Sequence, residues 1–435
     1  MTLLRWGRAF KGVLAHPQTL PRAEAALAVL GGAIAGFASQ SVIARNTSKD
    51  SFGQYLLVLG VLNIAQVPVS MELGAAATRF ARGMYDSGDR ASLESLTRVG
   101  LVVPACICLL LTFIPAPSPL FSWPVRLLAA ALLFSMAATR FLTQLLAAFS
   151  RQRVVNIAYQ LLRPAATLAI NLYLLRSTTI RLTPVVILLV SSTIGAYLAL
   201  VWISFDTVST LAAVSPSNKV NSPKGRPRDW LAYSMPLVIG SVVSSAINTQ
   251  IDTIVVGKLL GASSAATYGL AAQIALVVAL IGQAIVNWEA PKWAFAIDRA
   301  QVTHSPITFR SAIAKSAAVA ALAATAVSVG SPLVPVVFGQ KYADALPLLF
   351  VLLVGQVLNA GFSAPIATLL NLAGYQRRAL ATVILSSIAA LGLSVVMTLS
   401  WGVVGTALAV VGAACMRAGV LYVVFNRSQL HHRKI

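Results

Sequence analysis

Long apolar runs separated by short polar segments dominate the chain. A helix needs about 20 apolar residues to cross the hydrocarbon core of a bilayer, and twelve runs approach or exceed that length. They predict membrane-spanning helices over residues 25–43, 54–77, 99–113, 126–149, 154–175, 184–204, 231–256, 265–287, 312–335, 345–370, 379–399 and 402–425. Residues 379–416 are uncharged and too long for one crossing, so Ser400, Trp401 and Gly402 predict a tight turn between the last two helices. The pattern predicts an all-α integral membrane protein.

One long polar interval, at residues 206–229, divides these helices into two sets of six. It is rich in Ser, Pro and Asn and carries four of the basic residues. We therefore predict a first lobe over 24–205, a cytoplasmic linker over 206–229 and a second lobe over 230–425. A basic cytoplasmic segment over 1–23 precedes the lobes, and a basic cytoplasmic tail over 426–435 follows them.

The composition agrees with a membrane location and gives the orientation. A chain that is 57% hydrophobic and only 10% charged lies far outside the balance of a soluble domain. Its net charge of +21 would suggest nucleic acid as the partner of a soluble protein, but here the basic residues lie between apolar runs. With the N-terminus in the cytoplasm, 22 of the 33 Lys and Arg lie in inside segments and 7 in outside loops. This asymmetry predicts that both termini are cytoplasmic and that basic residues anchor the protein to membrane lipids.

Signatures of enzymes and cofactor sites are absent from the sequence. It contains no phosphate-binding G-x-x-x-x-G-K loop, no H-E-x-x-H and no nucleophile elbow. The three cysteines lie in apolar runs without metal-ligand spacing. We therefore expect a protein that is not an enzyme and that has no cofactor beyond a coupling proton or sodium ion. Gly32 and Gly36 form a G-x-x-x-G spacing, which indicates close packing of the first helix.

Two arginines lie near the middle of predicted helices. An ionisable side chain near the bilayer centre costs about 2.5–3.5 kcal/mol on insertion scales, and it is kept mostly where it faces a watery cavity or a partner. Arg140 and Arg163 lie on consecutive helices joined by a short turn. Together they would form a cationic patch that can bind a diphosphate bidentately. The alternative is that they bond helix carbonyls or pair with Glu72.

Two acidic residues are candidates for ion coupling. Glu72 and Asp252 lie within apolar runs, where a carboxylate can bind a proton or sodium ion, as an ion-coupled transporter requires. Each could instead form a structural salt bridge. Lys315 and Arg417 lie within a few turns of the predicted cytoplasmic boundary, so we expect them to extend to the interface as anchors.

Amide side chains are scattered through the apolar runs. They are costly in lipid unless they face one another or water. They therefore favour a hydrated passage that holds sugar hydroxyls, with hydrogen bonding between helices as the competing account. The candidate substrate contacts, with Arg45 and the two mid-helix arginines added, are Gln40, Arg45, Asn63, Gln66, Arg140, Arg163, Asn248, Gln273, Gln356 and Asn359.

Short motifs in a fixed order resemble the polysaccharide transport group of the multidrug/oligosaccharidyl-lipid/polysaccharide exporter superfamily. This group contains the O-antigen and exopolysaccharide repeat-unit flippases. The motifs span nearly the whole chain and are built from common residues, so their order is the specific feature. They are Ala44-Arg45 with Phe52-Gly53-Gln54-Tyr55, Glu72-Leu73-Gly74 with Arg79, Tyr233-Ser234-Met235-Pro236, Asp252 with Gly257 and Leu260-Gly261, Tyr268, Val337-Phe338-Gly339 with Tyr342, Ala373-Gly374-Tyr375-Gln376-Arg377, and Gly402-Val403-Val404-Gly405.

The resemblance implies two six-helix lobes around a central cavity and transport by alternating access. It implies an undecaprenyl-diphosphate-linked oligosaccharide as cargo, a bacterial inner membrane as location, and other polysaccharide-assembly proteins as partners. The alternatives are a multidrug or toxin exporter and a lipid-linked peptidoglycan-precursor flippase of the same superfamily. A membrane glycan polymerase or ligase is a weaker alternative, because the outside loops are short.

Overall fold

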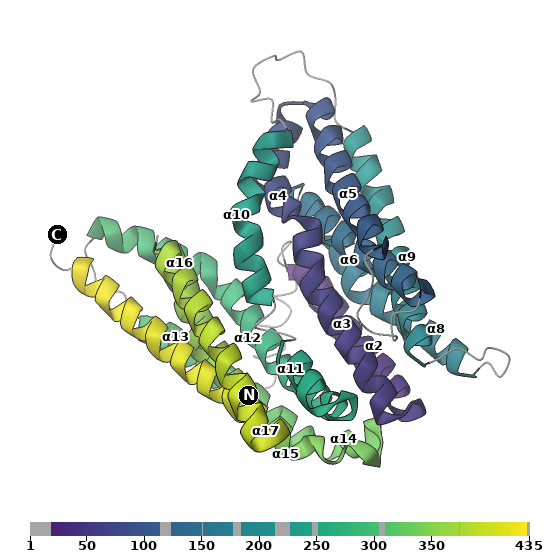
Figure 1. Cartoon of the computed structure of the whole chain (residues 1–435). Coiled ribbons are helices and arrows are strands. Elements are labelled where there is room, and N and C mark those ends of the chain that lie inside the picture. The colour runs from purple at the N-terminus through teal and green to yellow at the C-terminus, as the bar shows by residue number, and fades with distance from the viewer. Residues whose placement is uncertain are drawn as a thin grey trace, which may run out of the picture. The chain divides into compact units, whose positions relative to one another are not determined.

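The structure is a computed structural model that describes residues 19–113, 123–149, 151–176, 184–213, 227–245, 251–303, 309–373 and 375–432. In these ranges the regular elements are helices (Figure 1). The α-helices are α2 Thr19–Asn46, α3 Lys49–Ser70, α4 Leu73–Asp86, α5 Arg90–Phe113, α6 Trp123–Ala148, α7 Gln152–Val155, α8 Arg163–Arg176, α9 Pro184–Ala212, α10 Pro227–Ser245, α11 Ile251–Leu260, α12 Ala262–Thr303, α13 Phe309–Gly330, α14 Leu333–Phe338, α15 Ala345–Leu358, α16 Ala364–Leu372 and α17 Gln376–His432. Two π-helices, η1 Asn156–Leu162 and η4 Asn359–Ser363, and a 3-10 turn, η3 Gln340–Tyr342, complete the order.

The predicted all-α membrane protein is confirmed. Eight helices in the described ranges are long and apolar enough to cross a membrane, and the longest of them, within α17, holds two predicted spans. The other three predicted spans, over 25–43, 154–175 and 231–256, fall on α2, on η1 with α8, and on α10 with α11.

The second predicted helix, over 54–77, is wrong in one respect: it is broken at Met71 and Glu72. Both residues adopt left-handed backbone angles, with φ of 46° and 49°, and separate α3 from α4. Pro68 in the last turn of α3 has no N–H and so interrupts the helical hydrogen bonds just before the break. The apolar run continues through this point, so hydropathy gave no sign of the turn. A left-handed conformation costs a non-glycine residue roughly 1–2 kcal/mol.

The predicted turn at Trp401 and Gly402 is confirmed. Trp401 has φ −128° and Gly402 has φ 62°, which divides α17 into two arms. The arms run back side by side (Figure 1), because Thr398 Oγ1 lies 2.7 Å from Thr406 Oγ1 and a Cβ on Gly412 would lie 3.3 Å from Leu393. Glycine suits this corner because it has no Cβ to oppose a positive φ.

The chain divides into two compact units. The first contains Met1–Asn46 and Ile64–Ser241, and the second contains Thr47–Asn63 and Val242–Ile435. These units differ from the predicted lobes, because residues 47–63 fall in the second unit and residues 230–241 in the first. The first has an apolar core between α4, α5, α6, α9 and α10, and the second has one between α12, α16 and α17.

Candidate functional site

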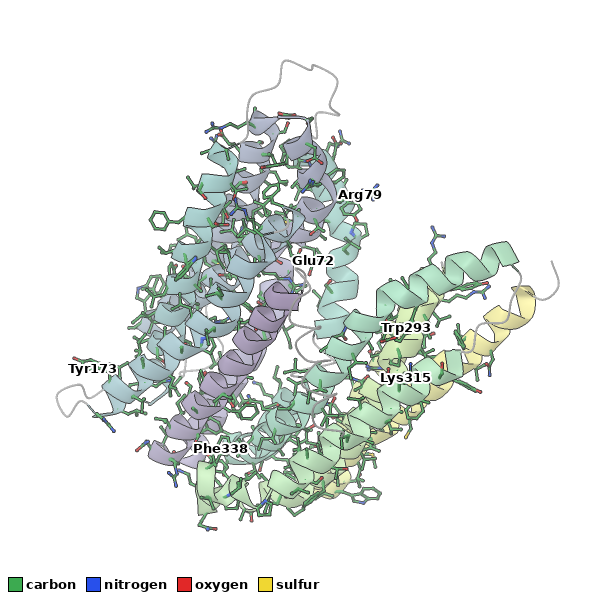
Figure 2. The ribbon with its side chains drawn as sticks, turned by 180° about the vertical axis from the view of Figure 1, so that it is seen from behind. Glu72, Arg79, Tyr173, Trp293, Lys315 and Phe338 are labelled. Carbon is green, nitrogen blue, oxygen red and sulfur yellow. The ribbon has the colours of Figure 1, made fainter. Side chains whose placement is uncertain are left out.

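In the first unit, α6 and the break between α3 and α4 place a charged pair together. Arg140 Nη2 lies 2.5 Å from Glu72 Oε1. The side chain of Glu72 is 5% exposed and that of Arg140 is 31% exposed. Of the two accounts that the sequence left open for Arg140, the structure supports the ion pair. Figure 2 labels Glu72 at the end of α3, where the helix breaks.

Close packing fixes α6 beside this break. A Cβ on Gly74 would lie 2.2 Å from Oε1 of Gln144, so only glycine at position 74 leaves space for that side chain. On the neighbouring helix α5, a Cβ on Gly100 would lie 2.2 Å from the ring of Phe141. Gln144 Oε1 is buried and has no hydrogen-bond partner within the described ranges. Arg140 is therefore held on a tightly packed helix face, next to an unsatisfied acceptor one turn away.

Arg163 takes a different partner. It begins α8 directly after the π-helix η1, and its guanidinium carbon lies 5.2 Å from the ring centroid of Tyr159. This cation–π contact stabilises a half-buried guanidinium. Arg140 and Arg163 thus contact different groups in the structure, and the diphosphate clamp formed by both together stays a prediction.

A polar cavity lies within the second unit. It measures about 90 Å³, which is space for several water molecules. Five polar side chains line it from five elements: Asp252 of α11, Gln273 of α12, Gln356 of α15, Asn359 of η4 and Arg417 of α17. The structure therefore brings together one predicted coupling residue and three of the predicted amides, which are up to 107 positions apart in the chain.

The polar groups of this cavity form a partly satisfied network. Ser394 Oγ donates a hydrogen bond of 3.0 Å to Asp252 Oδ1. Arg417 donates to the hydroxyls of Ser386 and Ser387, at 3.3 and 3.4 Å. The Oε1 atoms of two lining residues, Gln273 and Gln356, are buried and lack a hydrogen-bond partner in the described part of the chain. Unsatisfied buried acceptors in a polar cavity favour binding of water, a hydroxyl group or a cation.

Arg417 corrects a prediction from the sequence. We expected an interfacial anchor, but the residue is 9% exposed and lines the cavity. Its distance from the end of an apolar run was a poor guide, because depth along a helix does not show which side faces the protein. The better signal was the polar stripe of Ser386, Ser387, Ser394 and Thr398 on the facing arm of α17. Lys315, the other expected anchor, is exposed, and Figure 2 labels it on α13.

The remaining predicted contacts do not gather at either site. Gln40 is half-buried on α2, and its Oε1 lacks a hydrogen-bond partner among the described residues. Arg45 is exposed at the end of α2, while Asn63 and Gln66 are half-buried on α3. Asn248 lies outside the described residues. Their roles in substrate binding stay predictions.

The sequence gave no warning of a contact between two loops predicted on the outer side. We call it the outer-loop contact, and its residues are Thr47, Lys49, Phe52, Lys341, Tyr342 and Asp344. Lys49 Nζ lies 3.2 Å from Asp344 Oδ2, Lys341 donates to the carbonyl of Thr47, and Phe52 packs edge-on against Tyr342 at 5.8 Å. Burial and the charge of Lys49 lower the pKa of Lys341. A Cβ on Gly53 would lie 1.8 Å from the carbonyl oxygen of Ala262, so α3 and α12 also touch here.

The fold is shared with known transporters. The structure resembles an inward-facing multidrug resistance MATE family transporter of the MOP superfamily, with a TM-score of 0.73 and 14% identity, over 94% of this chain and 99% of that one. A mutant of the Vibrio cholerae MATE transporter VcmN gives 0.64 and 13%, over 94% and 97%. The lipid II flippase MurJ, in an inward closed conformation, gives 0.61 and 12%, over 91% and 86%. These folds belong to transporters and a flippase, which agrees with the expectation that the chain is not an enzyme.

A family model also matches the sequence. The model described as polysaccharide biosynthesis protein covers residues 25–287, which is more than half of the chain. No curated protein matches.

Proposed function

Because the chain belongs to the polysaccharide biosynthesis protein family, we propose that it flips lipid-linked oligosaccharides across a membrane. The proposed cargo is an undecaprenyl-diphosphate-linked repeat unit, and the proposed location is the bacterial inner membrane with both termini in the cytoplasm. The family match carries this proposal, since it joins a multi-pass membrane protein to glycan assembly. The transporter fold agrees with it.

The chemistry of the described sites suits such a cargo. A flippase must move a diphosphate and several sugars through hydrocarbon, whereas the lipid tail can remain in the bilayer. Arg140 supplies a partly exposed guanidinium in the first unit for the anionic group. Gln273, Gln356 and Asn359 supply amides in the second-unit cavity, where hydroxyl groups can bond.

We assign ion coupling to Asp252 in preference to Glu72. Glu72 is in direct contact with Arg140, which leaves no space for a cation between them. Asp252 instead accepts a hydrogen bond from a neutral hydroxyl and opens on a cavity of about 90 Å³. A proton or sodium ion entering there would reach a carboxylate, and the ion gradient or the membrane potential would then drive alternating access.

Deletion of the gene tests the proposal. We expect deletion to stop glycan export and to make lipid-linked oligosaccharide accumulate on the cytoplasmic leaflet, measured by extraction and mass spectrometry of the lipid-linked sugars. The full chain supplied in trans should restore export. Accumulation of sugar-free carrier lipid, with no lipid-linked oligosaccharide, would place the protein outside the flipping step.

A multidrug exporter is the second candidate, because a transporter of that class gives the TM-score of 0.73. The same deletion strain separates the two functions. An exporter predicts increased sensitivity to cationic drugs with normal glycan export, while a flippase predicts the reverse.

A further inference from the structure

The ion pair between Glu72 and Arg140 combines a strained backbone with a guanidinium that solvent can reach. We propose that the Glu72 carboxylate occupies the place of the cargo's phosphate on Arg140, and that an incoming diphosphate displaces it. This inference rests on the proposed function and adds the exchange of one anion for another at a named pair of residues.

The geometry of the guanidinium permits the exchange. The ion pair joins Nη2 of Arg140 to Oε1 of Glu72 at 2.5 Å. A guanidinium has five N–H donors in a planar fork, and a diphosphate offers several oxygens that can accept from two of them at once. Because the side chain of Arg140 is 31% exposed, an anion can approach it without unfolding α6.

The backbone under Glu72 permits the carboxylate to leave. Met71 and Glu72 have φ of 46° and 49°, and the side chain of Glu72 makes no capping bond to the start of α4. Two consecutive non-glycine residues in the left-handed region store strain, and such strain persists at switching sites. Glu72 thus lies at a joint between two helices, whereas Arg140 lies in the interior of one. Movement of the joint separates the pair and leaves Arg140 in place.

Binding of farnesyl diphosphate to the purified full chain in detergent, measured by isothermal titration calorimetry, tests the exchange. Glu72→Gln keeps the shape of the side chain and removes the competing charge, so we expect binding to tighten by about tenfold, which corresponds to roughly 1.4 kcal/mol. Arg140→Ala should abolish binding. Arg140→Lys keeps the charge without the planar fork and should bind more weakly than the original chain. Glu94→Gln is the matched control, because Glu94 pairs with Arg90 at 2.7 Å on the surface, and it should change nothing.

Two results would overturn the exchange. One is a Glu72→Gln protein that melts at the original temperature and binds farnesyl diphosphate no more tightly. The other is an Arg140→Ala protein that binds it normally. Farnesyl monophosphate and inorganic pyrophosphate serve as further ligands: binding as tight as that of farnesyl diphosphate would show, respectively, that one phosphate suffices or that the lipid is dispensable, and either would refute a lipid diphosphate as the ligand. Glycan export by the same variants is scored separately, so loss of the exchange with export still dependent on Arg140 leaves the proposed function standing.

Discussion

The first helix contains two glycines, one turn apart, that the structure places in opposite surroundings. A Cβ built on Gly32 would lie 1.5 Å from the carbonyl oxygen of Gln160, whereas a Cβ on Gly36 would meet nothing within 4 Å. The carbonyl of Gln160 is special because the residue four positions later is Pro164, which has no N–H to donate to it. The chain widens there into the π-helix η1, and α2 packs against it. Gly32→Ala should therefore force two backbones apart, while Gly36→Ala should not.

The expected difference between the two variants is large enough to measure. A carbon atom cannot approach a carbonyl oxygen to 1.5 Å, and that oxygen belongs to the backbone and cannot rotate away as a side chain can. Overpacking of this kind costs about 1–3 kcal/mol. Alanine gains about 1 kcal/mol of helix propensity over glycine at both positions, so Gly36→Ala provides the internal reference. The assay is thermal unfolding of the purified protein in detergent, with the amount of folded protein as a second readout. Equal melting temperatures for the two variants would refute the close approach of α2 to Gln160.

Three further predictions concern the second unit. Asp252→Asn should abolish glycan export at unchanged protein level, measured as surface glycan in the complemented deletion strain, and normal export would remove Asp252 from ion coupling. Disulfide formation between Lys49→Cys and Asp344→Cys, in a background without the native cysteines, should arrest export until a reductant is added; export at the full rate by the cross-linked protein would show that the outer-loop contact need not open. Gly402→Ala should lower the melting temperature, since its φ of 62° costs a residue with a side chain roughly 1–2 kcal/mol, and it should lower it more than Gly419→Ala, a helical site with open space.

The positions of most helices were predictable from the sequence, because the length of an apolar run is fixed by the thickness of the bilayer. The turn at Gly402 was also predictable, since a glycine beside an interfacial tryptophan interrupts a run too long for one crossing. The break at Met71 and Glu72 was not. Neither residue favours a left-handed backbone, and the surrounding run stays apolar, so Pro68 was the one local sign. Tertiary packing, here of Gly74 against Gln144, decides such a break.

The candidate site was predictable in its chemistry and not in its partners. Sequence analysis singled out Asp252, Gln273, Gln356 and Asn359 because polar groups in lipid need a reason to be there. It could not show that these four lie around one cavity, since the choice depends on which face of each helix turns inward. It misassigned Arg417 for the same reason: hydropathy measures how deep a residue lies along its helix and says nothing of its direction.

Each unit pairs a carboxylate with an arginine, and the difference between the two pairs indicates a division of labour. In the first unit the groups touch, so the carboxylate neutralises the arginine until a stronger anion competes for it. In the second unit Asp252 and Arg417 line the same cavity and bond to serine hydroxyls, which leaves the carboxylate accessible to a small cation. Anion exchange then belongs to the first pair and cation coupling to the second. Variants at Glu72 should therefore change the dependence of transport on the cargo's phosphate, whereas variants at Asp252 should change its dependence on the ion gradient.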